Sequence, residues 1–171
     1  DRLEFTVIPD PQVILLKFMN GELDLFGRYS RIDMFPTLKA GESSGGYRLR
    51  IAGPGSGPCF YLNWDADKPN IKTAFRTRPV RIALSHAINR EEVSQIVYHG
   101  LLAPIGYSFG SANPFSSEEA LKKYTRYDPD YAKQLLDEAG YTDNDGDGWR
   151  DFPDGERMEI TIDVVGPGSG V

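Results

Sequence analysis

The segment TDNDGDGWRDFPDGE (residues 142–156) concentrates the side chains best suited to holding a cation. Its aspartates are Asp143, Asp145, Asp147, Asp151 and Asp154. With Gly148 at the bend, the first four match the ligand positions of a calcium-binding loop. The last ligand position carries Asp154, which is shorter than the bidentate glutamate expected there. Two interpretations stay open: a structural calcium site, or a solvated acidic turn.

No catalytic group stands out elsewhere. The glycine-rich stretch 53–58 lacks the spacing of a dinucleotide fingerprint or of a phosphate loop. Ser56 does not stand in the G-x-S-x-G pattern of a nucleophile elbow. His86 lies within an apolar helical pattern and His99 precedes a glycine, positions typical of packing and capping. We therefore expect a protein without enzymatic activity.

The composition argues against several classes of protein. The chain has 171 residues, a net charge of −6 and a pI near 4.9, whereas nucleic-acid binding favours a basic face. No apolar run approaches the roughly 18 residues needed to span a bilayer. The single cysteine, Cys59, cannot form an internal disulfide, so cysteine usage leaves the compartment open. Both ends resemble cut structural elements, and we expect a fragment of a longer protein.

Strand and helix patterns alternate along the chain, and these elements must position the candidate groups. Period-two alternation, as in Leu3, Phe5 and Val7, is typical of a half-buried strand. The predicted strands are 2–8, 22–26, 47–52, 59–64 and 158–165, of which 59–64 is apolar enough to be buried on both faces. The predicted helices are 14–19, 31–40, 78–88, 90–99, 116–124 and 129–139. This alternation favours an α/β fold with some parallel pairing.

Start signals or an apolar stripe strengthen three of the helix predictions. Asn89 and Glu92 are spaced as a capping box, and Asp128 precedes a proline at a first helical position. Val80 and Ala83 belong to a stripe at helical spacing, which predicts a buried face.

Aromatic residues gather at predicted strand ends and in loops, at 25–29, 59–64 and 104–110. Aromatic rings beside Asn, Arg and Gly suit a pocket that holds a polar ligand between flat faces. The alternative is that these rings belong to the core at the edges of a sheet.

The order of several segments resembles a known family. NGELDLFGRY (20–29), CFYLNWDADKP (59–69) and YDPDYAKQLLDEAGY (127–141) occur in the order found in the family 5 extracellular solute-binding proteins. The most specific part is RPVRIALSHAINREEV (78–93), in which Asn89 stands where aspartate is more usual. The resemblance runs from about Phe5 to Val165, and the family includes the oligopeptide- and dipeptide-binding proteins.

The resemblance implies a two-lobed α/β architecture of the periplasmic-binding-protein-like type II, of which this chain would hold a part. Residues 1–64 would form the end of one lobe and residues 65–171 the start of the other, with the crossing near 63–75. It also implies a periplasmic or extracellular receptor of an ABC importer. Such a receptor delivers its cargo to a permease and meets the membrane only through that permease or a lipid anchor.

The resemblance also implies cleft residues, carried over by position. These are Phe26, Gly27 and Arg28 after the first matching strand, and Cys59, Tyr61 and Asn63 in the second. Tyr61 stands near the position at which peptide-binding members are expected to carry an acidic residue. Gly27 and Arg28 stand where a Tyr-Asn pair is familiar in those members. Peptides are the expected ligands, and an oligosaccharide is the alternative within the family.

An alternative from a different class is a small calcium-stabilised interaction module, and a hydrolase ranks third for want of a nucleophile. Calcium modules usually pair two loops, and one such loop is present here. The family also carries an acidic, glycine-rich turn at this place, which explains the bend without a metal. We therefore expect no cofactor, with structural calcium as the exception.

Overall fold

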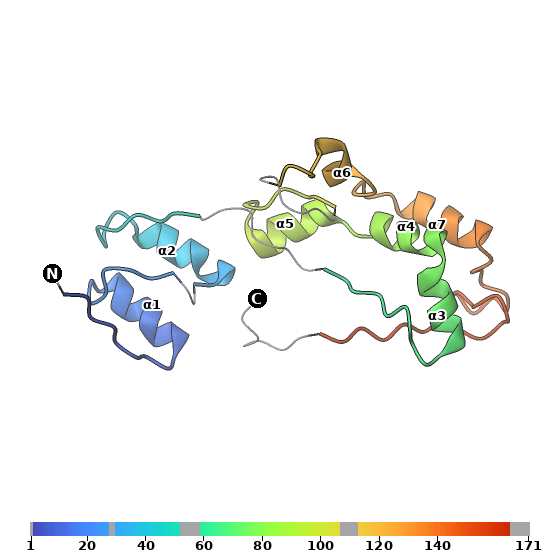
Figure 1. The fold of residues 1–171 in the computed structure, drawn as a ribbon, viewed down its shortest axis with the longest axis horizontal. Helices are drawn as coiled ribbons and strands as arrows, with labels where there is room; N and C mark the ends of the chain where they lie inside the picture. The colour runs from blue at the N-terminus through green and yellow to red at the C-terminus, as the bar shows by residue number, and fades with distance from the viewer. Residues whose placement is uncertain (1, 28–29, 52–58, 107–112, 165–171) are drawn as a thin grey trace. The chain divides into compact units, whose positions relative to one another are not determined.

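The computed structural model describes residues 2–27, 30–51, 59–106 and 113–164 (Figure 1). The chain divides into two compact units, and the described part of the first ends at residue 51. The described part of the second begins at residue 59. Each unit has its own cluster of buried apolar side chains.

The first unit is built on short helices that begin at clear signals. Helix α1 is Pro11–Met19, and α2 is Phe35–Gly41, preceded by the 3₁₀ turn η1 at Ile32–Met34. The Asp10 carboxylate caps α1 by accepting a hydrogen bond from the backbone N–H of Gln12 at 2.7 Å. The predicted helices at 14–19 and 31–40 are confirmed.

The core of the first unit lies where these elements meet. Leu15 of α1, Met34 of η1 and Leu38 of α2 are buried together. Half-buried apolar side chains that pack against them are Phe18, Met19, Phe26, Tyr47 and Leu49. Phe26, one of the expected cleft residues, is therefore held by this core.

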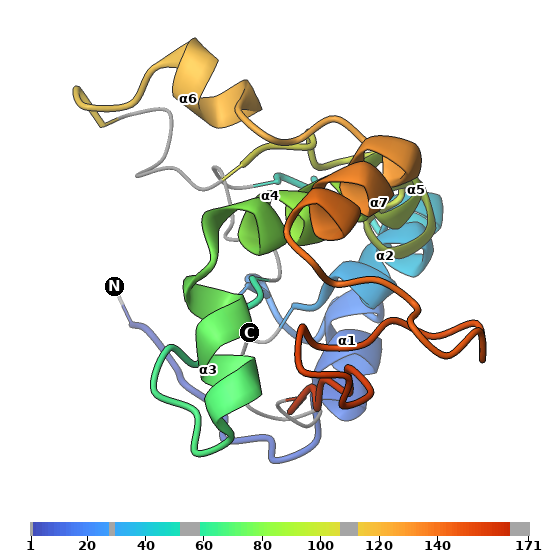
Figure 2. The same cartoon turned by 90° about the vertical axis from the view of Figure 1, so that its right-hand side faces the viewer.

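The second unit is helical in its described part. Its helices are α3 (Pro69–Arg76), α4 (Arg78–His86), α5 (Arg90–Tyr98), α6 (Glu118–Lys122) and α7 (Pro129–Glu138). Figure 2 shows α4 alongside α7, and these two helices make the most extensive contact in the unit. Val80 and Ala83 of α4 are almost completely buried, which confirms the predicted stripe.

Both predicted helix starts are present. The Asn89 side chain accepts from the N–H of Glu92 at 3.1 Å, and the Asp128 side chain accepts from the N–H of Tyr131 at 3.0 Å. His99 follows α5 in a left-handed conformation, with φ of 53°, as its C-cap. The capping prediction for His99 is thus confirmed.

His86 packs within the second unit. Its side chain is buried, and Nδ1 lies 2.7 Å from the carbonyl oxygen of Arg126. The ring also meets Tyr131 of α7 edge-on, with the ring centroids 5.2 Å apart. His86 therefore joins α4 to the start of α7, as a packing residue rather than as an exposed base.

The predicted strands are not observed in the described part of the chain. Segments 2–8, 22–26, 47–51, 59–64 and 158–164 contain no strand, and an isolated antiparallel bridge joins Asp151 and Arg157. Leu3, Phe5 and Val7 are each more than four-fifths exposed. Period-two alternation shows which side chains share a face, but a strand also needs a partner ladder, and these segments have none here. The α/β character expected from the sequence is therefore not seen in the described residues.

Helices in the described residues are short: none is both long and apolar enough to cross a membrane.

Candidate functional site

Two hollows in the first unit meet at the segment that carries Phe26. One, of about 330 Å³, is lined by Phe18, Phe26, Tyr47, Asp24 and Arg48 among others. The other, of about 400 Å³, lies on the side of residues 4–8 and is lined by Phe26 and Gly27. Phe26 and its neighbours Leu23 and Leu25 line both hollows. The structure thus places two expected cleft residues, Phe26 and Gly27, at the walls of a concave surface.

Aromatic rings form one wall of the smaller hollow. The Phe18 ring lies 5.7 Å from that of Phe26 and 4.8 Å from that of Tyr47, between ring centroids, and both pairs are tilted. The hydroxyl of Tyr47 donates to the carbonyl oxygen of Leu38 at 2.6 Å, which fixes the ring. The wall is therefore a set of rings held in place from α1 and α2.

Glycine is required beside this wall. A Cβ atom built on Gly45 would lie 2.4 Å from Cε1 of Tyr47, closer than any real contact. The backbone at Gly45 can approach the ring face because it carries no side chain. Tyr47 was predicted as a strand residue and not as a site residue, and no local pattern in the sequence links it to Phe18.

The hollow also offers opposite charges. Asp24 and Arg48 both line it, and no ion pair joins them in the described part of the chain. A carboxylate and a guanidinium beside aromatic rings can bind a ligand with both an ammonium and a carboxylate group. Arg28, the third residue expected here, lies outside the described residues.

The second group of expected cleft residues lies in the extended segment before α3. The prediction that this segment is buried on both faces is wrong: Cys59 is exposed and Tyr61 is 92% exposed. Burial of an apolar strand needs packing over both faces, and the exposure of Cys59 and Tyr61 shows that such packing is incomplete in the described residues. Asn63 is also exposed, and its side-chain oxygen accepts from the N–H of Asp65 at 3.0 Å.

Trp64 belongs to the aromatic group at 59–64 but was not among the expected cleft residues. The guanidinium of Arg81 from α4 lies 4.9 Å from the centroid of the Trp64 ring. The carbonyl oxygen of Trp64 also accepts from Nε of Arg76 at 2.8 Å. Trp64 is half exposed, so part of this stacked ring faces solvent. The pairing depends on α4 returning to the segment before α3, which a one-dimensional pattern does not reveal.

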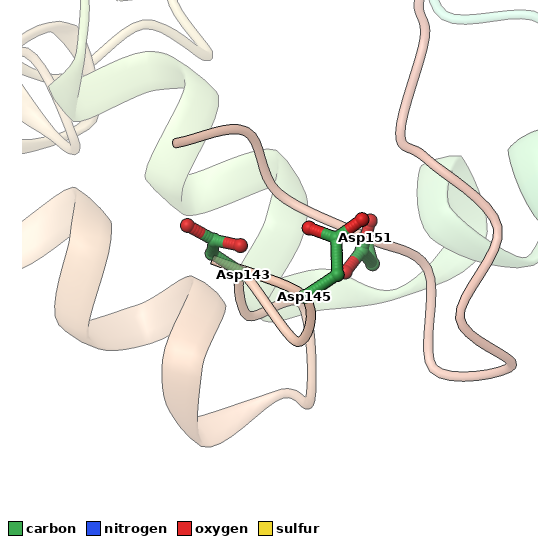
Figure 3. Close-up of side chains that lie close together, drawn as sticks. All are labelled: Asp143, Asp145 and Asp151. Carbon is green, nitrogen blue, oxygen red and sulfur yellow. The ribbon is translucent and has the colours of Figure 1, made fainter. Parts of the chain in front are cut away.

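The acidic loop brings three of its five aspartates together. Carboxylate oxygens of Asp143, Asp145 and Asp151 lie within 4.8 Å of one another (Figure 3). Asp143 and Asp145 are exposed, whereas Asp151 is buried. Three carboxylates at this separation could hold a hard cation through oxygen ligands.

The same carboxylates already accept hydrogen bonds from their own loop. Asp143 accepts from the N–H groups of Gly146 at 2.7 Å and Gly148 at 2.9 Å, and Asp151 accepts from that of Asn144 at 2.8 Å. The N–H of Gly148, followed in effect by that of Gly146, holds the pKa of the Asp143 carboxyl below its usual value. The loop is therefore folded around its own side chains.

The other two aspartates of the predicted metal set have different partners. Asp147 accepts from the N–H of Trp149 at 2.8 Å and lies 4.0 Å from the guanidinium of Arg157. Asp154 accepts from the side-chain amide of Asn70 in α3 at 2.8 Å, a bond that lowers the pKa of Asp154. Neither belongs to the group of three carboxylates.

A comparison with protein-family models finds one family that matches nearly the whole chain. The model described as "Bacterial extracellular solute-binding proteins, family 5 Middle" matches residues 1–168. No solved structure matches the chain.

Three curated relatives are similar at low identity. The "Nickel-binding periplasmic protein" of Escherichia coli (strain K12) is 27% identical over 96% of this chain and 30% of its own length. "Heme-binding protein A" of Haemophilus influenzae is 28% identical over 82% of this chain and 24% of its own. "Oligopeptide-binding protein AppA" of Bacillus subtilis (strain 168) is 29% identical over 95% of this chain and 28% of its own. The chain thus spans less than a third of the length of each relative.

Proposed function

Because the chain belongs to the family 5 bacterial extracellular solute-binding proteins, we propose that it is part of an extracytoplasmic receptor of an ABC importer. The receptor binds a solute without chemical change and delivers it to the membrane permease. The match over residues 1–168 carries this proposal. The protein works in the periplasm or outside the cell, and it meets the membrane through the permease or a lipid anchor.

We propose that the chain contributes to two lobes of a larger α/β protein, residues 1–64 to one and residues 65–171 to the other. The family implies a periplasmic-binding-protein-like fold. Exposed apolar residues in the extended segments support pairing with further strands, since Leu3, Phe5 and Val7 are almost fully exposed. The chain also spans 30% or less of each of the three relatives named above, so a longer protein has residues to supply those partners.

The proposed solute is a peptide, bound in part by the hollow beside Phe26. Aromatic rings can hold its side chains, while Asp24 and Arg48 bind its ammonium and carboxylate groups. The relatives are named for nickel, heme and oligopeptide, so the peptide assignment rests on this hollow and not on the relatives. An oligosaccharide stacked on the same rings is the alternative within the family.

Binding measurements on the native gene product test this proposal. Isothermal titration calorimetry with tripeptides, and separately with cello- and malto-oligosaccharides, should give heat with the peptides. Phe26→Ala should weaken peptide binding by roughly tenfold, because a buried aromatic contact is lost. The matched control is Phe115→Ala, since Phe115 is 85% exposed and lies in the second unit. Heat with oligosaccharides alone would replace the peptide assignment, and equal effects of both variants would remove Phe26 from the site.

A second candidate function is a calcium-stabilised interaction module. The observation in its favour is the group formed by Asp143, Asp145 and Asp151, with carboxylate oxygens within 4.8 Å. A rise of several degrees in melting temperature with micromolar calcium, lost in Asp145→Asn, would support the module. An unchanged melting temperature with millimolar calcium would reject it.

A further inference from the structure

Two cationic side chains converge on one tyrosine of the second unit, whereas the residues proposed to bind the solute belong to the first unit. Arg78, the first residue of α4, donates from Nη2 to the hydroxyl oxygen of Tyr124 at 3.0 Å. Nζ of Lys123 lies 5.4 Å from the centroid of the same ring. Two positively charged side chains therefore contact the same phenol group, one at its hydroxyl and the other at its ring.

Neither cation forms an ion pair with a carboxylate within the described residues, although the neighbouring cations do. Lys122 pairs with Glu118 at 2.5 Å, and Arg126 pairs with Asp128 at 2.6 Å. Lys123 lies between them in sequence and turns to Tyr124 instead. In a chain of net charge −6, two adjacent cations without an acidic partner leave a local excess of positive charge.

The tyrosine is fixed from the backbone. Tyr124 has a left-handed conformation with φ of 59°, which is uncommon for a residue other than glycine. Its carbonyl oxygen accepts from Oγ of Ser85 in α4 at 2.7 Å. Two residues later, the carbonyl oxygen of Arg126 contacts the buried His86. Bonds to α4 on both sides of Thr125 thus hold Tyr124 in a strained conformation beside Arg78.

Hydrogen-bond donors remain available at this point. The phenol oxygen accepts from Arg78 and keeps its own hydrogen, and Lys and Arg side chains carry several N–H donors each. The bond from Arg78, and then the charge of Lys123, lower the pKa of Tyr124 despite partial burial of the ring. The surroundings of the hydroxyl group therefore favour negative charge.

We propose that Arg78, Lys123 and Tyr124 form a binding site for an oxyanion, either a carboxylate or a phosphate group. Arg78 and Lys123 supply charge-assisted hydrogen bonds, and the hydroxyl of Tyr124 donates a third. This proposal does not depend on the proposal that Phe26 contributes to solute binding. Either proposal can be wrong while the other is right.

The test is an NMR titration of the native gene product with inorganic phosphate and, separately, with sodium acetate. Ionic strength is held constant with sodium chloride. The Nε–Hε signal of Arg78 and the ring signals of Tyr124 should shift and saturate with at least one anion. Phosphate alone or acetate alone identifies the kind of oxyanion, and both support the site.

Three variants and one control decide whether the three side chains make the site. Arg78→Gln and Lys123→Gln should each weaken binding by roughly tenfold, and Tyr124→Phe should weaken it by roughly threefold, because each loses a hydrogen bond. The control is Lys122→Gln, which removes the same charge from the neighbouring position and should change affinity by less than about twofold. Shifts that do not saturate, or an equal effect of Lys122→Gln and Lys123→Gln, would overturn the proposal. Signals of the α4–α7 core verify that each variant is folded.

Discussion

At the scale of single residues, the Asp143 carboxylate shows how a loop can depend on pH. Backbone N–H groups of Gly148 and Gly146 lower its pKa in the folded state. Stabilisation is therefore present above the ordinary pKa of aspartate, about 3.9, and is lost as the pH falls through the lowered value. We expect the Asp143 carboxyl carbon to titrate below the ordinary aspartate value of about 3.9 in an NMR pH series. A midpoint at or above that value would show that the N–H bonds do not persist in solution.

Gly45 gives a second prediction at this scale. Gly45→Ala would place a Cβ atom 2.4 Å from the Tyr47 ring, so the ring or the backbone must move. We expect a loss of about 1–3 kcal/mol in the free energy of unfolding, measured in urea. A second variant, Gly45→Ala with Tyr47→Leu, removes the ring and should lose less than the two single changes added together. Strict additivity would mean that the two positions do not meet.

At the scale of elements, the helices depend on local signals that the sequence carries. Asp128→Ala removes both the N-cap of α7 and the partner of Arg126. We expect a loss of about 1 kcal/mol in the free energy of unfolding of the second unit. The control is Asp130→Ala in the first turn of the same helix, since the Asp130 side chain is 92% exposed and makes one long ion pair. Equal losses from the two variants would show that the cap contributes nothing.

The same locality explains which elements could be predicted. Helices around Asn89 and Asp128 were predicted because a cap, a period and a glycine stop all lie within a few residues. Helix α3 was not predicted, although Pro69 stands at its first position. The segment 2–8 was predicted as a strand from alternation and 59–64 from its apolar residues, and neither forms a strand in the described residues. Pairing joins residues distant in sequence, so alternation does not determine it.

The candidate site, too, could be predicted only in part from the sequence. Phe26 and Gly27 were proposed as cleft residues by resemblance alone; both line hollows of the first unit, and their role in binding stays a prediction. Tyr47 and Trp64 reach their places through packing against other elements, which spacing along the chain does not encode. Of the acidic loop, the sequence gives the ligand-like spacing, whereas the division into a group of three and two outliers depends on Asn70 and Arg157.

At the scale of the whole molecule, exposed apolar segments should make the 171-residue chain associate with itself. Leu3, Phe5 and Val7 present large apolar side chains on a segment that has no ladder partner among the described residues. We expect sedimentation velocity to show species larger than the monomer that increase with concentration, and Phe5→Lys to reduce them. The matched control is Thr6→Lys, which adds the same charge to the neighbouring residue. If both variants reduced association equally, net charge rather than the Phe5 side chain would be responsible.

The turn at residues 143–151 has a practical consequence. Its carboxylates bond to amides of the same few residues: Asp143 to Gly146 and Gly148, and Asp151 to Asn144. Because these hydrogen bonds lie within the turn itself, we expect the turn to keep its conformation when it is transplanted into a hairpin of another protein. The host would gain exposed negative charges at Asp143 and Asp145, and it would need to cover Asp151, which is buried.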